Sequence, residues 1–255
     1  MAKIVSTHSF RGGTGKSNLT ANVAATLALQ GSRVGVIDTD VQSPGIHVPF
    51  GVDQENLHFT LNHYLWGQCT IEEAATDVTS ALDDCRSGTP EGAALFLIPA
   101  SIRTNDIARI LKSGYDPACL DDGIHRVLHR LRLDYLLIDT HPGVNEETLL
   151  SIAISDVLII LLRPDYQDYQ GTAVTVELAR HLDVPELRLV INKVPASADR
   201  TSLLADVERQ YKASVVGVIP LSQQMVELGS SGLFCLRFPV DPYTNEIQRI
   251  AASLL

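Results

Sequence analysis

The sequence predicts an α/β fold in which a mostly parallel, twisted sheet is covered by helices on both faces. Short apolar runs alternate with longer amphipathic segments, which is the pattern of repeated strand–helix units. Hydrophobic residues make up 45% of the chain and aromatic residues only 5%, so aliphatic side chains fill most of the interior, as in strands buried on both faces. A chain of 255 residues can bury one sizeable core, and we expect a single domain over residues 1–255.

The apolar runs mark the strands of this predicted sheet. They lie at residues 4–7, 34–38, 95–99, 135–139, 157–162, 187–192 and 215–219. Helices fill most of the intervals between them. The first, at 16–30, places Leu19, Val23 and Leu27 on one face and ends before Gly31, a residue suited to a left-handed cap.

Three further helices and one loop follow from local signals. A capping-box pattern opens a short helix at Thr70–Glu73, and helices are also expected at residues 104–112 and 121–131. The polar stretch 77–92 is predicted to be a surface loop. Near the end of the chain, residues 244–255 hold a single cation, so we expect no stable membrane anchor there. Ile247, Ile250 and Leu254 are instead spaced for packing onto the body.

Composition excludes several classes of protein. The net charge of -10 and a pI of about 5.2 argue against a surface coated in basic residues for nucleic acid, although a local basic patch is not excluded. The cysteines form no C-x-x-C pair, which argues against zinc or iron–sulfur ligands and favours reduced, buried thiols; they are Cys69, Cys85, Cys119 and Cys235. The amino-terminal apolar stretch is too short for a signal peptide, so we expect a cytoplasmic protein.

The strongest local signal is a glycine-rich loop between the first strand and the first long helix. It reads Ser9-Phe10-Arg11-Gly12-Gly13-Thr14-Gly15-Lys16-Ser17. Glycines let backbone N–H groups curl around phosphate oxygens, and the following helix N-terminus favours an anion. We expect Lys16 to neutralise the phosphates and Ser17 to bind Mg, while Thr14 and Asn18 line the loop or cap its helix. The alternative is an ordinary glycine turn before a helix.

Two other strands end in carboxylates. Asp38 and Asp40 end the second predicted strand, and Asp139 ends the fourth after an apolar run, which is the Walker B pattern of a Mg ligand acting through water. The first two could equally be a plain pair of carboxylates at a strand end. Asn192 likewise ends a strand, where a simple turn-forming role competes with a binding role.

The glycine-rich loop resembles the deviant Walker A motif K-G-G-x-G-K-[ST] of the ParA/MinD family, with Arg11 in place of the signature lysine. This resemblance implies the P-loop NTPase fold and a nucleotide site that includes Gly12, Gly13, Gly15, Lys16 and Ser17. It also implies that Arg11 reaches across a dimer to the partner's nucleotide; a bond to a local carboxylate or to solvent is the competing interpretation.

The resemblance continues through the rest of the chain. It implies that Asp40 activates the attacking water, that Asp38 supports the Mg shell, and that switch II is formed by Thr140, Pro142 and Gly143. His141 stands where proline is common, and we expect it to be a solvated loop residue. Adenine binding is implied for three residues in and after the later strands, namely Asn192, Pro220 and Leu221.

The function implied is that of a Mg-dependent ATPase, a nucleotide-switched homodimer with ATP at its interface that positions cargo. A partner protein is expected to activate hydrolysis, and dispersed Lys and Arg residues leave non-specific DNA binding open. Three alternatives remain: a ligase or amidotransferase-like enzyme that uses ATP on a small carboxylate, a metal-inserting or reductase relative, and a regulator that binds nucleotide without hydrolysing it.

Overall fold

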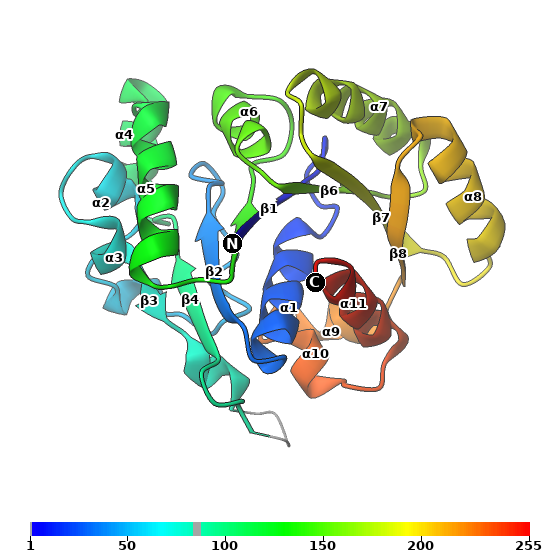
Figure 1. The fold of residues 1–255 in the computed structure, drawn as a ribbon, viewed down its shortest axis with the longest axis horizontal. Coiled ribbons are helices and arrows are strands. Elements are labelled where there is room, and N and C mark those ends of the chain that lie inside the picture. Colours follow the sequence, from blue (N-terminus) through cyan, green and yellow to red (C-terminus); the bar gives the residue numbers. More distant parts are fainter. Residues whose placement is uncertain (1, 84–87) are drawn as a thin grey trace.

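The computed structural model describes residues 2–83 and 88–255. Its strands are β1 (Lys3–His8), β2 (Arg33–Asp38), β3 (Thr76–Asp77), β4 (Ala94–Ile98), β5 (Tyr135–Asp139), β6 (Val157–Leu162), β7 (Glu186–Val194) and β8 (Ser214–Pro220). Within these residues they form one sheet in the order β3-β4-β2-β5-β1-β6-β7-β8, parallel throughout except for β3 against β4 (Figure 1). The predicted mostly parallel α/β sheet is confirmed.

Helices cover both faces of the sheet, as predicted (Figure 1). One face carries α1 (Lys16–Leu29), α9 (Gln223–Leu228), α10 (Phe234–Arg237) and α11 (Pro242–Ser253). The other carries α2 (Leu61–Leu65), α3 (Ile71–Ala74), α4 (Thr104–Ser113), α5 (Pro117–Arg130), α6 (Glu146–Ala153), α7 (Tyr166–His181) and α8 (Arg200–Tyr211). Two short 3-10 helices, η1 (Gln54–Asn56) and η2 (Thr79–Leu82), lie in the connections.

Helix α1 is buried between the sheet and α11. Leu19 and Leu27 are fully buried, and the chain turns after the helix at Gly31, whose φ of 97° is left-handed as predicted. Three apolar side chains of the carboxyl-terminal segment are also fully buried, namely Ile247, Ile250 and Leu254. The prediction that this segment packs onto the body is confirmed.

Two expectations about local structure need correction. The predicted loop 77–92, of which 84–87 lie outside the described residues, is not a surface loop throughout, because Asp77 pairs with β4 and the side chains of Val78 and Leu82 are buried. Helix α5 begins at Pro117 rather than at residue 121, because Asp116 accepts a hydrogen bond from the N–H of Ala118 and caps the helix there.

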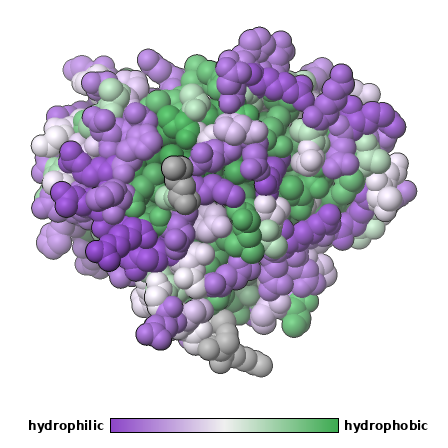
Figure 2. Space-filling model, in the orientation of Figure 1, coloured by the Kyte–Doolittle hydropathy of each residue, from purple (hydrophilic) through white to green (hydrophobic). Residues whose placement is uncertain are grey.

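The cysteines are less buried than expected. Cys69 and Cys119 are half-buried and Cys235 is buried, while Cys85 lies outside the described residues. On the face shown in Figure 2, hydrophilic side chains cover much of the surface, and apolar side chains are visible towards the middle of the view. In the part of the chain that the structure describes, no helix has the length and apolar character needed to span a bilayer.

The sheet order brings the predicted site residues to one edge. Strand β1 lies between β5 and β6, so the strand order reverses at its carboxyl end, where open α/β sheets bind ligands. The neighbouring strands β2 and β5 are in register at their last residues, Asp38 and Asp139, and Thr7 of β1 pairs with Asp139. The glycine-rich loop and both acidic strand ends therefore meet.

Candidate nucleotide-binding site

The loop between β1 and α1 has the backbone of a phosphate cradle. Gly13 and Gly15 have φ values of 74° and 102°, a left-handed conformation that side chains other than glycine rarely adopt. The Thr14 hydroxyl donates to Ser9 Oγ at 2.9 Å and is buried, so it holds the loop from inside. Gly15 caps the helix without a side-chain bond, so neither Thr14 nor Asn18 is a helix cap.

Lys16, the first residue of α1, is buried with 8% of its surface exposed. Burial lowers the pKa of its ammonium group, and the carboxylates of Asp139, Asp40 and Asp38 raise it. The structure therefore brings together the cation and the three acids that the sequence predicted. An ammonium group in this setting is available to anionic oxygens at the loop, since the acids near it lie on neighbouring strand ends.

Asp139 has an oxygen without a partner. The residue is 2% exposed, and among the described residues its Oδ1 accepts no hydrogen bond. Burial raises the pKa of its carboxyl to about 6, although Lys16 and a hydrogen bond from the Ser17 hydroxyl lower it. A buried, unpartnered carboxylate oxygen beside a serine hydroxyl is the donor chemistry that Mg²⁺ prefers, so the residues present fit the ion.

Asp38 organises the loop that follows β2. It is fully buried, its Oδ1 accepts from the N–H of Asp40 at 3.0 Å, and its Oδ2 accepts from the N–H of Gly45 at 3.3 Å. Burial and the neighbouring Asp139 and Asp40 hold the pKa of Asp38 well above its usual range. No three side chains among the described His, Cys, Asp and Glu residues form a metal cluster. Mg²⁺ needs only one or two protein ligands when phosphates and water supply the rest.

The carboxylate of Asp40 contacts His141, a residue that was expected in solvent. His141 Nδ1 lies 2.8 Å from Asp40 Oδ1, and the histidine side chain is 24% exposed. His141 lies in a loop, as expected, but it is half-buried and contacts Asp40 instead of only solvent. The contact depends on β2 and β5 being neighbours, because each residue lies two positions beyond a registered strand end.

The predicted switch II segment begins against the end of β1. The Thr140 hydroxyl donates to the carbonyl of Thr7 at 2.9 Å, and the N–H of Gly143 donates to the carbonyl of Ser9 at 3.2 Å. Pro142 Cγ lies 3.9 Å from where a Cβ would stand on Gly12. The segment therefore packs against the glycine-rich loop.

Sequence reasoning missed His8, the last residue of β1. Its side chain is fully buried and its Nδ1 lies 2.8 Å from Thr140 Oγ1. Because the single hydroxyl proton of Thr140 goes to Thr7, His8 Nδ1 carries the hydrogen and Nε2 is left without a partner among the described residues. Burial, and then Lys16 and His141, lower its pKa to about 3, so the ring is neutral.

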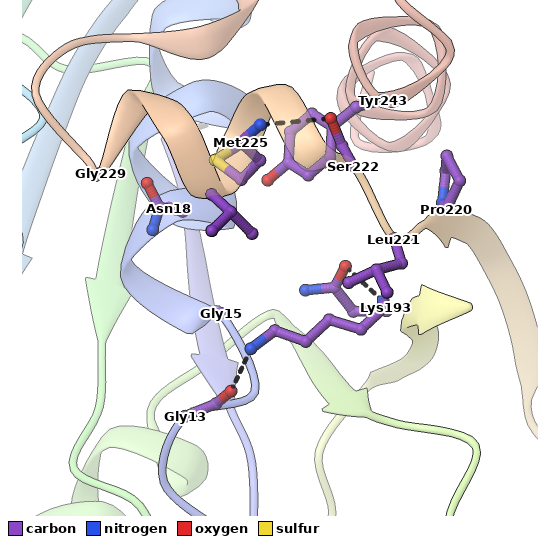
Figure 3. Close-up of a pocket in the computed structure, with 12 residues that line it drawn as sticks. Gly13, Gly15, Asn18, Lys193, Pro220, Leu221, Ser222, Met225, Gly229 and Tyr243 are labelled. Atoms are coloured by element: carbon purple, nitrogen blue, oxygen red, sulfur yellow. Dashed lines mark hydrogen bonds between the residues drawn. The ribbon is translucent and has the colours of Figure 1, made fainter. Parts of the chain in front are cut away.

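A cavity of about 330 Å³ opens beside the glycine-rich loop (Figure 3). The predicted base-binding residues Asn192, Pro220 and Leu221 line it, and Asn18 faces it from α1. Sequence reasoning missed the other side chains of the wall, namely Lys193, Ser222, Met225, Val226 and Tyr243. A largely apolar cavity beside a phosphate cradle has the size and position for a nucleobase.

Both polar atoms of the Asn192 side-chain amide are hydrogen-bonded within the protein. Its Nδ2 donates to the carbonyl of Thr14 at 2.7 Å, and its Oδ1 accepts from the N–H of Lys193 at 2.8 Å. Lys193 in turn extends across the cavity and donates from Nζ to the carbonyl of Gly13 at 2.7 Å (Figure 3). Consecutive residues of β7 thus fix the glycine-rich loop from the base side.

Known proteins are similar to this chain over most of its length. The profile of a protein family described as an AAA domain matches residues 2–184. The chain belongs to the ParA/MinD family. The flagellum site-determining protein YlxH of Helicobacter pylori is 30% identical over 265 residues, covering 99% of this chain and 82% of that protein. An iron–sulfur cluster carrier protein of Methanocaldococcus jannaschii is 27% identical, covering 88% of this chain and 74% of that protein.

The fold of the ParA/MinD family is also found in solved structures. The septum site-determining protein MinD of Pyrococcus horikoshii, complexed with Mg-ADP, has a TM-score of 0.80 at 20% identity, covering all of this chain and 96% of that one. The similarity extends beyond the matched profile to α11, so the P-loop NTPase fold accounts for the whole described chain.

Arg11 occupies the position of the family's signature lysine. In this structure its guanidinium donates to the side-chain oxygen of Gln167 at the start of α7, within the same chain. Burial raises the pKa of the neighbouring Asp168, but hydrogen bonds and the charge of Arg163, and then the charge of Arg11, hold it below its usual value. Gln167 is an amide rather than a carboxylate, so the charge of Arg11 has no paired anion at hydrogen-bond distance among residues 2–83 and 88–255.

Proposed function

We propose that this chain is a Mg-dependent ATPase whose single domain, residues 1–255, switches between a monomer and an ATP-bound homodimer to position a cargo in the cytoplasm. The observation that carries the proposal is the unpartnered Oδ1 of Asp139 beside Ser17 and the buried Lys16. This is an arrangement that a Mg-nucleotide would complete and that a purely structural loop has no need of.

Each residue at the sheet edge has a role in this scheme. Lys16 and the backbone of Gly12, Gly13 and Gly15 bind the phosphates, and Ser17 and Asp139 hold Mg²⁺, which supplies charge neutralisation when bound. Asp38 fixes the loop that carries Asp40. Asp40 orients the attacking water and accepts its proton.

Adenine is favoured over guanine by the cavity. Guanine readers offer a carboxylate to the base, and no Asp or Glu lines the described wall of this cavity. Asn18, Pro220 and Leu221 contact the base in this scheme, whereas Asn192 acts indirectly by holding the loop. The nucleotide is therefore proposed to be ATP.

The homodimer is proposed from the family resemblance and from Arg11. Because Arg11 is half-buried and, within the described part of the chain, its side chain bonds only to an amide oxygen, it can leave Gln167 for the phosphate of a partner's nucleotide at small electrostatic cost. Timing by a partner protein is carried over from the same resemblance. The metal-inserting or reductase alternative is less favoured, since Cys69, Cys119 and Cys235 form no metal cluster among the described residues.

The test is the mass of the protein in solution, measured by light scattering with ATP-Mg and with ADP-Mg. Wild type and Asp40→Ala are compared, because loss of hydrolysis should prolong the ATP state. We expect a dimer only with ATP, persisting in Asp40→Ala and lost in Arg11→Ala. A monomer in every state would remove the dimer switch and favour the small-molecule ATP enzyme. An Arg11→Ala protein with normal dimerisation and phosphate release would remove the role of Arg11 across the interface.

A further inference from the structure

The contact between Asp40 and His141 joins two separate loops. Strands β2 and β5 are parallel neighbours with Asp38 opposite Asp139, so the loops that leave them run side by side. Asp40 and His141 each lie two residues further on, and their side chains meet at 2.8 Å between Oδ1 and Nδ1. Since a carboxylate oxygen accepts, His141 Nδ1 carries the hydrogen and donates it.

Asp40 is held from both sides. Its Oδ1 also accepts from the N–H of Ser43 at 2.9 Å and from the Ser43 hydroxyl at 3.0 Å, so its own loop supplies two donors and the β5 loop supplies the third. The carboxylate is 13% exposed, which shields the charged hydrogen bond from His141 from much of the solvent screening that weakens surface contacts. Both features restrict where this carboxylate can move.

The donor at position 141 departs from the motif that this segment resembles. The D-T-P-P-G segment that residues 139–143 resemble places proline at this position, and a proline side chain has no hydrogen to donate. The histidine therefore adds a link between the loops that proline cannot form. The other ring nitrogen, Nε2, is not needed for the link.

We propose that His141 is a positioning residue that ties the β2 loop to the β5 loop and fixes the Asp40 carboxylate for the attacking water. This rests on the proposed ATPase function, because Asp40 is the group through which His141 acts. The link holds the β2 loop before nucleotide binds, so its effect is measurable without catalysis. His141 itself contacts no reacting atom in this scheme.

Four variants of the full chain test the role. His141→Ala removes the donor, His141→Asn retains an N–H near the position of Nδ1, and His141→Gln moves the N–H to the position of Nε2. His129→Ala, an exposed histidine on α5, is the control. Amide hydrogen exchange at Ser43 is measured without nucleotide, and ATP cleavage is measured in single turnovers across ATP concentrations.

We expect Ser43 to exchange roughly tenfold faster in His141→Ala and His141→Gln, and close to the wild-type rate in His141→Asn and His129→Ala. The maximal cleavage rate should fall about tenfold in the same two variants at unchanged half-saturating ATP. Unchanged exchange in His141→Ala, or equal loss in His141→Asn, would overturn the link. Altered exchange with normal cleavage would overturn the positioning role. If wild type cleaves no ATP, the proposed function fails, while the exchange data still decide the link.

Discussion

Replacing Asp139 by asparagine should stabilise the nucleotide-free protein at neutral pH while removing its response to Mg-nucleotide. The folded chain buries this carboxyl completely beside Asp38, and raises its pKa from an ordinary value of 3.8 to about 6. A pKa raised on folding means that the folded state binds the proton more tightly than the unfolded state. The contribution of protonated Asp139 to the free energy of unfolding is therefore fully present below pH 4 and is lost as the pH rises through 6.

The size of the effect follows from the two pKa values. A difference of one in pKa corresponds to about 1.36 kcal/mol, so ionised Asp139 lowers the free energy of unfolding by about 3 kcal/mol above pH 6. Asparagine has nearly the same shape and no charge. The stability gained by Asp139→Asn should thus grow from near zero below pH 4 to ~3 kcal/mol at pH 7.

The assay is chemical denaturation of wild type and variant, without divalent metal, between pH 4 and pH 8. Asp168→Asn is the matched control, because Asp168 is also buried but hydrogen bonds from Arg163 outweigh burial and lower its pKa. This control should lose stability at pH 7, where the first variant gains it. Adding Mg-ADP should then stabilise wild type but not Asp139→Asn. A variant no more stable than wild type at pH 7, or a gain independent of pH, would refute the reasoning.

Three other changes test the loop, the cavity and the core. In Gly15→Ala, the added Cβ would lie 2.6 Å from the side-chain amide nitrogen of Asn192, on a left-handed backbone. ADP affinity, measured by calorimetry, should therefore fall at least tenfold. Gly31 is equally left-handed but faces open space, so Gly31→Ala should lose only ~1–2 kcal/mol of stability. Lys193→Met keeps an aliphatic side chain across the cavity but removes the hydrogen bond from Nζ to the carbonyl of Gly13, so it should weaken ADP binding about fivefold. Lys193→Ala removes both and should weaken ADP binding more. Ile250→Ala empties a fully buried position on α11 and should cost about 2–5 kcal/mol in denaturation without changing ADP affinity of the folded protein. Equal ADP affinity in Gly15→Ala and Gly31→Ala would contradict the role of Gly15 in the loop. Equal ADP affinity in wild type and both Lys193 variants would contradict the role of the Lys193 contact.

The phosphate cradle and the acidic strand ends could be predicted because their signals are local. Glycine, lysine and serine at fixed spacing after an apolar run specify a backbone turn and a helix start within nine residues, and an apolar run ending in Asp139 specifies a strand end. The parallel sheet then brings such ends to one edge whatever the strand order. These local signals do not specify which strands are neighbours in the sheet.

The contacts that sequence reasoning missed depend on which strands are neighbours in the sheet. His141 meets Asp40 because β5 lies beside β2, although the residues are 101 positions apart, and no pattern near either residue signals this. His8 and Lys193 likewise act on segments that are distant in sequence. The burial of Val78 and Leu82 was missed for another reason, since a few apolar residues in a polar stretch give too short a pattern to establish a periodicity.

Because β2 and β5 are neighbours, a ligand bound at Asp139 would affect the β2 loop that carries Asp40. Asp38 holds the backbone of the β2 loop with both oxygens, and its pKa is raised partly by Asp139 across the strand pair. A cation at Asp139 would favour the charged form of Asp38, and a charged carboxylate accepts hydrogen bonds more strongly than a neutral one. Binding at one strand end would thereby tighten the loop that carries Asp40, while His141 ties that loop back to the strand where binding began.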